Sequence, residues 1–162
     1  SFVDEGTDVG PYAHLRPNAK LGKNVHIGNF VEVKNATIGD GTKAGHLAYI
    51  GDSDLGSKIN IGCGVIFVNY DGKFKHRSLV EDNAFIGSNS NIIAPVTIEK
   101  EAYIAAGSTI TSNVEAGALS IERAEQKNIA GYVEKKRKRD LEKEKEQKWH
   151  LITHNYLFTE EN

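Results

Sequence analysis

The sequence predicts an all-β protein, a parallel β-helix of hexapeptide repeats, followed by a C-terminal charged and partly helical tail. Three observations support this fold class. Branched aliphatic residues recur six positions apart without a break from position 80 to position 110. Small or β-branched residues stand two positions before most of them, and fifteen of the sixteen glycines lie at or before Gly117. A period of six fits neither a helix nor one alternating strand, but it fits short strands joined by tight corners.

The aliphatic residues expected to point inward can be followed along the chain. The uninterrupted run consists of Val80, Ile86, Ile92, Ile98, Ile104 and Ile110. The earlier members are Val9, Leu15, Leu21, Ile27, Val33, Ile38, Ala44, Ile50, Leu55, Ile61 and Phe67. Glycine often follows directly, and we expect it to provide backbone freedom at the corners. Residues 69–76 fall outside the repeat and are expected to form a loop. A β-sandwich with coincidental spacing is the alternative fold.

Composition excludes several function classes. The 162 residues include 20 Lys and Arg against 22 Asp and Glu, a formal net charge of −2, which argues against nucleic acid as the main ligand. No apolar run approaches the ~20 residues that a membrane span needs. One cysteine cannot form an internal disulfide, so we expect a cytoplasmic protein. A chain that starts at Ser1 and contains no Met is expected to be a piece of a longer protein.

Two domains are expected, a β-helix over residues 1–117 and a C-terminal arm over residues 118–162. Residues 133–148 contain eight Lys and Arg, five Asp and Glu, and only two apolar residues, a composition that favours a solvated helix. The basic cluster at 135–139 is interpreted as part of that solvated helix and not as a nucleic-acid site. Five apolar residues lie near the end of the sequence: Leu151, Ile152, Tyr156, Leu157 and Phe158. The sequence leaves open whether they pack against the coil or against another subunit.

The segment at residues 43–51 breaks the rule of aliphatic inside and polar outside, and two cationic positions lie upstream of it. His46 stands among small residues that leave room for a ligand, and histidine is the usual general base at neutral pH. Arg16 and Lys34 lie on neighbouring coils and are able to converge on one anionic group. A zinc site is not expected, because the histidines of the repeat are too widely spaced; they are His14, His26, His46 and His76.

Longer strings carry a specific resemblance. YAHLRPNAKLG, GNFVEVKNATIGDGTKAGHLAYIGD, INIGCGVIFVNYDG, FIGSNSNIIAPVTI and YIAAGSTIT resemble the C-terminal acetyltransferase domain of the bacterial GlmU family, over roughly residues 9–125. The resemblance implies a left-handed parallel β-helix and a homotrimer with active sites between subunits. It also implies acetyl transfer from acetyl-CoA to the amine of glucosamine-1-phosphate, on the route to UDP-N-acetylglucosamine for peptidoglycan and lipopolysaccharide. The magnesium-dependent uridylyltransferase domain of that family has no counterpart in this chain, and no metal is expected here.

The resemblance also implies residue roles. His46 matches the general base. The residues implied to bind glucosamine-1-phosphate are Arg16, Lys34, Tyr49 and Asn60, and those implied to bind acetyl-CoA are Cys63, Asn69, Tyr70, Lys75, Ser88, Ala106 and Arg123. Cys63 departs from the alanine of the family, a tolerable change where only a backbone N–H is used. Two alternatives remain: a hexapeptide-repeat acetyltransferase with another acceptor, and a non-catalytic β-helix interaction module.

Overall fold

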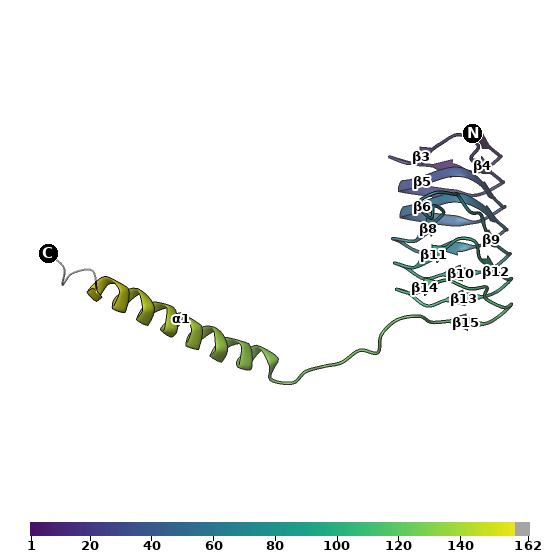
Figure 1. Ribbon diagram of the computed structural model, residues 1–162. Coiled ribbons are helices and arrows are strands. Elements are labelled where there is room, and N and C mark those ends of the chain that lie inside the picture. The colour runs from purple at the N-terminus through teal and green to yellow at the C-terminus, as the bar shows by residue number, and fades with distance from the viewer. Residues whose placement is uncertain (158–162) are drawn as a thin grey trace. The chain divides into compact units, whose positions relative to one another are not determined.

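The structure, a computed structural model, describes the backbone of residues 1–157 and the side chains of residues 1–152. The chain divides into two units after Ala124, a stack of β coils (Figure 1) and a segment that contains one helix. The predicted boundary between residues 117 and 118 stays a prediction.

The fifteen strands of the described residues are parallel where they pair, so the parallel β-helix predicted from the hexads is confirmed. They are β1 (Phe2–Val3), β2 (Asp8–Val9), β3 (His14–Leu15), β4 (Lys20–Leu21), β5 (His26–Ile38), β6 (Lys43–Leu55), β7 (Asn60–Ile61), β8 (Ile66–Val68), β9 (Ser78–Val80), β10 (Phe85–Ile86), β11 (Asn91–Ile93), β12 (Thr97–Ile98), β13 (Tyr103–Ile104), β14 (Thr109–Ile110) and β15 (Leu119–Ser120). Most are two or three residues long, as expected. β5 and β6 run through two corners each, because their ladder pairing continues around the bends.

Strand pairing divides the coil surface into three faces. The first face contains β2, β7, β10, β13, β15 and the first part of β5 and β6. The second face contains β3, β8, β11, β14 and the middle of β5 and β6. The third face contains β1, β4, β9, β12 and the last part of β5 and β6. We call the bend between the first and second faces the first corner.

The predicted inward residues form one continuous core. From Leu21 to Ile110 every one of them is buried, and stacking of the coils places each against its neighbours above and below. The two earlier ones are exceptions: Val9 has 41% of its surface exposed, and Leu15 is only partly buried. Both belong to the first coil, where no earlier described coil covers the end of the aliphatic column.

The expected role of glycine is wrong at most positions that follow an inward aliphatic. Gly28 and Gly87 do not have positive φ; instead the next coil is too close for a side chain. A Cβ at Gly28 would lie 1.8 Å from the carbonyl oxygen of Gly45, and one at Gly87 would lie 2.5 Å from the nitrogen of Ala106. Many left-handed corner positions are asparagines, which tolerate positive φ: Asn18, Asn24, Asn35, Asn83 and Asn89.

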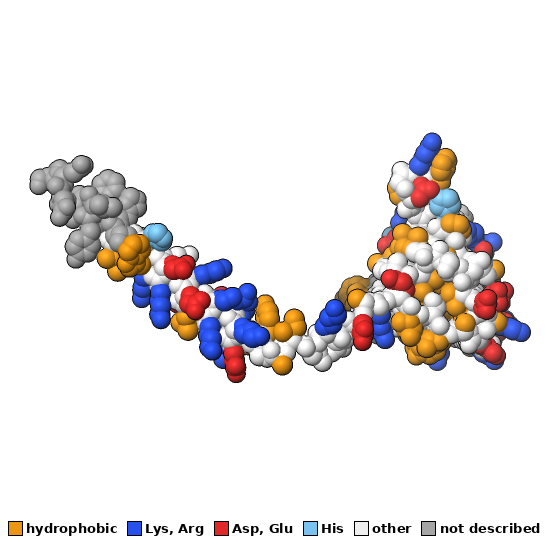
Figure 2. Space-filling model, turned by 60° about the horizontal axis from the view of Figure 1, so that its bottom comes forward, with side chains coloured by type: hydrophobic (Ala, Val, Ile, Leu, Met, Phe, Trp, Pro, Cys, Tyr) orange, Lys and Arg blue, Asp and Glu red, His pale blue; other side chains and the backbone are white. Residues whose placement is uncertain are grey.

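The helix α1 (Tyr132–Leu157) confirms the predicted solvated helix. Its described side chains, through residue 152, are exposed, and Figure 2 shows charges of both signs along it. Leu151 and Ile152 are exposed as well, whereas the side chains of Tyr156 and Leu157, and all of Phe158, lie outside the described residues. Within the described part of the chain, α1 included, helices lack the long apolar stretch required to cross a bilayer.

Candidate active site

Four residues with predicted site roles form one column on the first corner. Each stands two positions after an inward residue of the first face, and those inward residues pair in register from β6 through β7 and β10 to β13. Adjacent members are therefore one coil apart, about 4.8 Å in a parallel sheet. In order down the stack they are His46, Cys63, Ser88 and Ala106. The structure thus aligns the predicted base with three residues predicted for acetyl-CoA.

The lower part of this column has small side chains. Below His46 the left-handed positions of the same corner are Gly64, Asn89 and Gly107, which leave the backbone accessible. Cys63 is partly exposed. At the lower end, the Arg123 guanidinium donates a hydrogen bond of 2.6 Å to the carbonyl oxygen of Ala106.

Above Cys63 the same corner is bulky and apolar. Tyr12 and Phe30 stack with ring centroids 5.5 Å apart, and Leu47 follows one coil below Phe30. His46 lies directly before Leu47 and is exposed, and its ring makes no hydrogen bond to the residues that the structure describes. Its ring therefore stands at the point where the bulky part of the corner meets the small-residue part.

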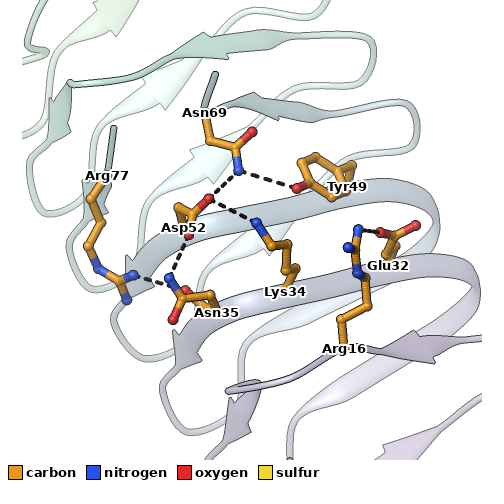
Figure 3. A network of polar contacts seen from close by, with 8 residues as sticks. All are labelled: Arg16, Glu32, Lys34, Asn35, Tyr49, Asp52, Asn69 and Arg77. Carbon is orange, nitrogen blue, oxygen red and sulfur yellow. Dashed lines mark hydrogen bonds and ion pairs between the residues drawn. The ribbon is translucent and has the colours of Figure 1, made fainter. Parts of the chain in front are cut away.

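The second face beside His46 carries a charged network (Figure 3). The Arg16 guanidinium donates to the Glu32 carboxylate at 2.8 Å, and the Lys34 ammonium lies 3.5 Å from the Asp52 carboxylate. The Tyr49 hydroxyl accepts a hydrogen bond of 3.2 Å from the Asn69 amide. The pairing of β3, β5 and β6 explains why these residues meet, because it sets Arg16, Lys34 and Tyr49 on adjacent coils of one face.

Two residues predicted for acetyl-CoA lie in this network instead of on the column. Asn69 is buried, and its amide donates to both Tyr49 and Asp52. The Lys34 side chain, by its proximity and by the repulsion of its charge, lowers the pKa of Lys75. The cause is the loop at residues 69–77, which leaves the coil after β8 and folds back over the second face.

Asp71 holds this loop together. One of its carboxylate oxygens accepts the backbone N–H groups of Lys73 and Phe74 at 2.8 and 2.6 Å, and the other lies 2.7 Å from the His76 ring. These hydrogen bonds, that of His76 first, lower the pKa of Asp71 to about 2. Tyr70, which is 56% exposed, donates its hydroxyl to the carbonyl oxygen of Gly72 at 2.6 Å.

Asn60 does not join the other predicted acceptor residues within one chain. It lies on the first face, in register with Lys43 and Phe85, whereas Arg16, Lys34 and Tyr49 lie on the second face. Its side chain is thus directed away from their network by the triangular section of the coil.

Residues that support the network were missed by the sequence analysis. Glu32 pairs with Arg16, and Asp52 joins Lys34, Asn35 and Asn69. Beside them, Arg77 binds the Asp54 carboxylate through two nitrogens at 2.6 Å and reaches the carbonyl oxygens of Asn35 and Ser53.

One sequence signal points to Asp52. It is an acidic residue at a corner position that Asn18 and Asn35 occupy in the two preceding coils. As for metals, no three His, Cys, Asp or Glu side chains gather closely enough to hold an ion in the part of the chain that the structure describes.

Comparisons with known proteins agree with this architecture. Residues 77–112 match the family of bacterial transferase hexapeptide (six repeats). Among solved structures, PerB from Caulobacter crescentus, in complex with CoA and GDP-perosamine, superposes with a TM-score of 0.63 at 23% identity, over 79% of this chain and 58% of that one. The acetyltransferase domain of PglB from Neisseria gonorrhoeae gives 0.63 at 17% identity, over 70% and 53%. At these identities the likeness establishes the fold alone.

Curated relatives are much more similar in sequence. "Bifunctional protein GlmU" from Clostridioides difficile is 62% identical over 140 residues, which are 86% of this chain and 30% of the relative. The protein of the same name from Enterococcus faecalis is 66% identical over 135 residues, 83% of this chain and 30% of the relative. The chain therefore spans about 30% of the length of these relatives. The predicted resemblance is confirmed: this chain is a hexapeptide-repeat protein homologous to a part of the bifunctional GlmU proteins.

Proposed function

We propose that the chain is a glucosamine-1-phosphate N-acetyltransferase with acetyl-CoA as its co-substrate. One observation carries the proposal: the small-residue column of the first corner continues down the stack from His46, and the second face, which carries the cationic network, begins directly after that corner. An acetyl donor on the column and a phosphorylated amino sugar on the network would bring their reacting groups together beside that ring.

The network suits an anionic acceptor. Arg16, Lys34 and Lys75 provide three positive charges, and Glu32 and Asp52 balance two of them. One positive charge is left without a carboxylate partner in the network, and it is available to a phosphate monoester. Arg binds phosphate through its planar fork and Lys as a point charge. We therefore assign Lys75 to the phosphate site, together with Arg16 and Lys34.

The column suits the extended arm of acetyl-CoA. Small side chains at positions 63, 88 and 106 let a slender chain approach the backbone over several coils. Arg123 stands at the lower end as a cation for the phosphates of the donor. In this assignment the thioester lies near Cys63, one coil below His46.

The chemistry follows from these positions. His46 takes a proton from the ammonium of the amino sugar, and the free amine attacks the thioester carbonyl. A C–N bond forms, the C–S bond breaks, and the nitrogen loses a second proton, which the departing thiolate of CoA takes up. In this proposal the backbone N–H of Cys63 stabilises the negative charge that develops on the carbonyl oxygen. General-base catalysis of this kind contributes on the order of 10²–10⁴ in rate.

A second copy of the chain would complete the acceptor site. Asn60 is expected to contact the acceptor but lies on the first face, away from Arg16, Lys34 and Tyr49. We therefore propose a homotrimer in which Asn60 of one copy faces the second face of its neighbour. Because the donor is acetyl-CoA and the chain has a single free cysteine, we place the enzyme in the cytoplasm.

Thiol release from acetyl-CoA tests the proposal. With the purified chain we expect release of CoA on addition of glucosamine-1-phosphate, in step with formation of N-acetylglucosamine-1-phosphate. Serine and unphosphorylated glucosamine serve as acceptor controls and should give far slower release. Equal rates with an acceptor that lacks a phosphate would favour another acetyltransferase. No release of CoA with any of these acceptors would favour an interaction module.

A further inference from the structure

Asp52 is a buried carboxylate at the centre of the second-face network (Figure 3). It is 7% exposed and lies at a corner with φ of 46°. The residues at the same corner of the two preceding coils are Asn18 and Asn35, with φ of 63° and 47°. Because asparagine adopts this conformation as readily as aspartate, the corner itself does not require a carboxylate. Burying a charge is costly unless the charge is paired. The partners of the Asp52 carboxylate therefore indicate what it does in the protein.

The partners of Asp52 are residues of the proposed acceptor site and their supports. Its carboxylate accepts hydrogen bonds from the Asn35 amide at 2.5 Å and from the Asn69 amide, and it lies 3.5 Å from the Lys34 ammonium. The same Asn69 amide donates to the Tyr49 hydroxyl. One carboxylate is thus joined to Lys34 directly and to Tyr49 through Asn69.

Asp52 is ionised at neutral pH. Burial raises the pKa of its carboxyl group, but the hydrogen bonds from Asn35 and Asn69 and the charge of Lys34 outweigh burial and bring the pKa below its ordinary value. The carboxylate is therefore available to hold the lysine as an ion pair that is largely shielded from water, since the Lys34 and Asp52 side chains are 17% and 9% exposed.

We propose that Asp52 is a positioning residue, whose carboxylate orients the Lys34 ammonium and the Asn69 amide to receive a phosphorylated acceptor. This inference rests on the proposed function. Long lysine side chains lose rotamer freedom when they bind, and a partner that fixes Lys34 in advance reduces this loss. Such contacts act equally before and during the reaction, so removing the carboxylate should raise KM for the acceptor with little change in kcat.

The variant Asp52→Asn tests this with little disturbance of shape, because it restores the residue type of the two preceding coils. We expect the KM for glucosamine-1-phosphate to rise about tenfold or more, as befits loss of a charged hydrogen-bonding partner. The kcat should stay within about threefold and the KM for acetyl-CoA should not change. Asp54→Asn is the matched control: it removes the neighbouring ion pair with Arg77 and should leave both KM values unchanged.

A double-mutant cycle separates positioning from general stability. Asp52→Asn should raise the acceptor KM by some factor in the wild-type background. In a Lys34→Gln background that factor should be at least three times smaller, because the two residues act together. An undiminished effect in that background, or an Asp52→Asn variant no different from Asp54→Asn, would overturn the inference. If wild-type protein acetylates glucosamine-1-phosphate normally in the same assays, these outcomes leave the proposed function standing; an inactive wild type would refute both.

Should Asp52→Asn lose cooperative unfolding, Asn69→Ala tests the same link from its other end. The inference predicts a raised KM for glucosamine-1-phosphate and an unchanged KM for acetyl-CoA. The reverse result would return Asn69 to the donor site and overturn the role assigned to Asp52.

Discussion

The upper coils of the second face and the lower coils of the first corner are built on the same inward aliphatic column, yet they differ completely outside it. The second face carries Arg16, Lys34 and Asp52 in ion pairs. The first corner below His46 carries only small, uncharged side chains at positions 63, 88 and 106. The comparison teaches that the hexad specifies the coil, while the outward positions specify the chemistry. We assign the first region to the acceptor and the second to the donor.

The largest expected effect comes from the residue at the top of the first-corner column. His46→Ala removes the proposed base, so we expect kcat to fall about 10²–10⁴-fold. The oligomeric state, followed by sedimentation, and the thermal midpoint should not change, because the ring is exposed and makes no hydrogen bond to the described residues. A folded variant with near-normal turnover would remove His46 from the mechanism.

On the acceptor side, Arg16→Ala removes one of the three cations. We expect the KM for glucosamine-1-phosphate to rise about ten- to hundredfold, the magnitude for loss of a charge-assisted contact, with an unchanged KM for acetyl-CoA. Steady-state kinetics with each substrate varied in turn measures this. Equal losses for both substrates would contradict the division into two regions.

On the donor side, Arg123→Ala is the corresponding change. Its guanidinium is exposed and holds the carbonyl oxygen of Ala106, so the effect should be smaller, about three- to tenfold on the KM for acetyl-CoA. The acceptor KM should stay the same. A rise in the acceptor KM instead would show that the corner does not hold the donor.

The smallest effect is expected from the tail. Every described α1 side chain is exposed, so a chain ending at Ala124 should keep its thermal midpoint within about 2 °C and its kcat within about twofold. Differential scanning calorimetry and the thiol-release assay measure both. A large loss of either would assign the tail a role in assembly or catalysis.

The fold could be predicted from the sequence because the β-helix is local and repetitive. Each hexad contributes one inward aliphatic, and coils that pair in register repeat the same contact, so period alone located the core from Leu21 to Ile110. The role of glycine was misassigned because glycine recurs with the same period for two different reasons. A corner can need its backbone freedom, or two coils can approach too closely for a side chain, and the period does not distinguish the two. Only the built coils show that a Cβ at Gly28 would collide with Gly45.

The site was harder to predict because it depends on contacts between coils. Resemblance placed Arg16 and Lys34 at the acceptor, His46 as the base, and Asn69 and Lys75 beside the donor, and these roles stay predictions. The loop that carries Asn69 and Lys75 folds back over the second face, and its course is set by Asp71, which no repeat pattern indicates. Asp52 was overlooked because its signal, an aspartate where the two preceding coils have asparagine, depends on aligning the corners of successive coils.

The central claim is that the second face recognises the phosphate of the acceptor, and one ratio tests it most directly. It is the kcat/KM for glucosamine-1-phosphate divided by that for glucosamine, measured in the wild type and in Lys34→Ala. The account predicts a wild-type ratio of about 100 or more, because a phosphate paired with several cations contributes a few kcal/mol, and a ratio reduced at least tenfold in the variant. A wild-type ratio near one, or a ratio unchanged by Lys34→Ala, would contradict the account.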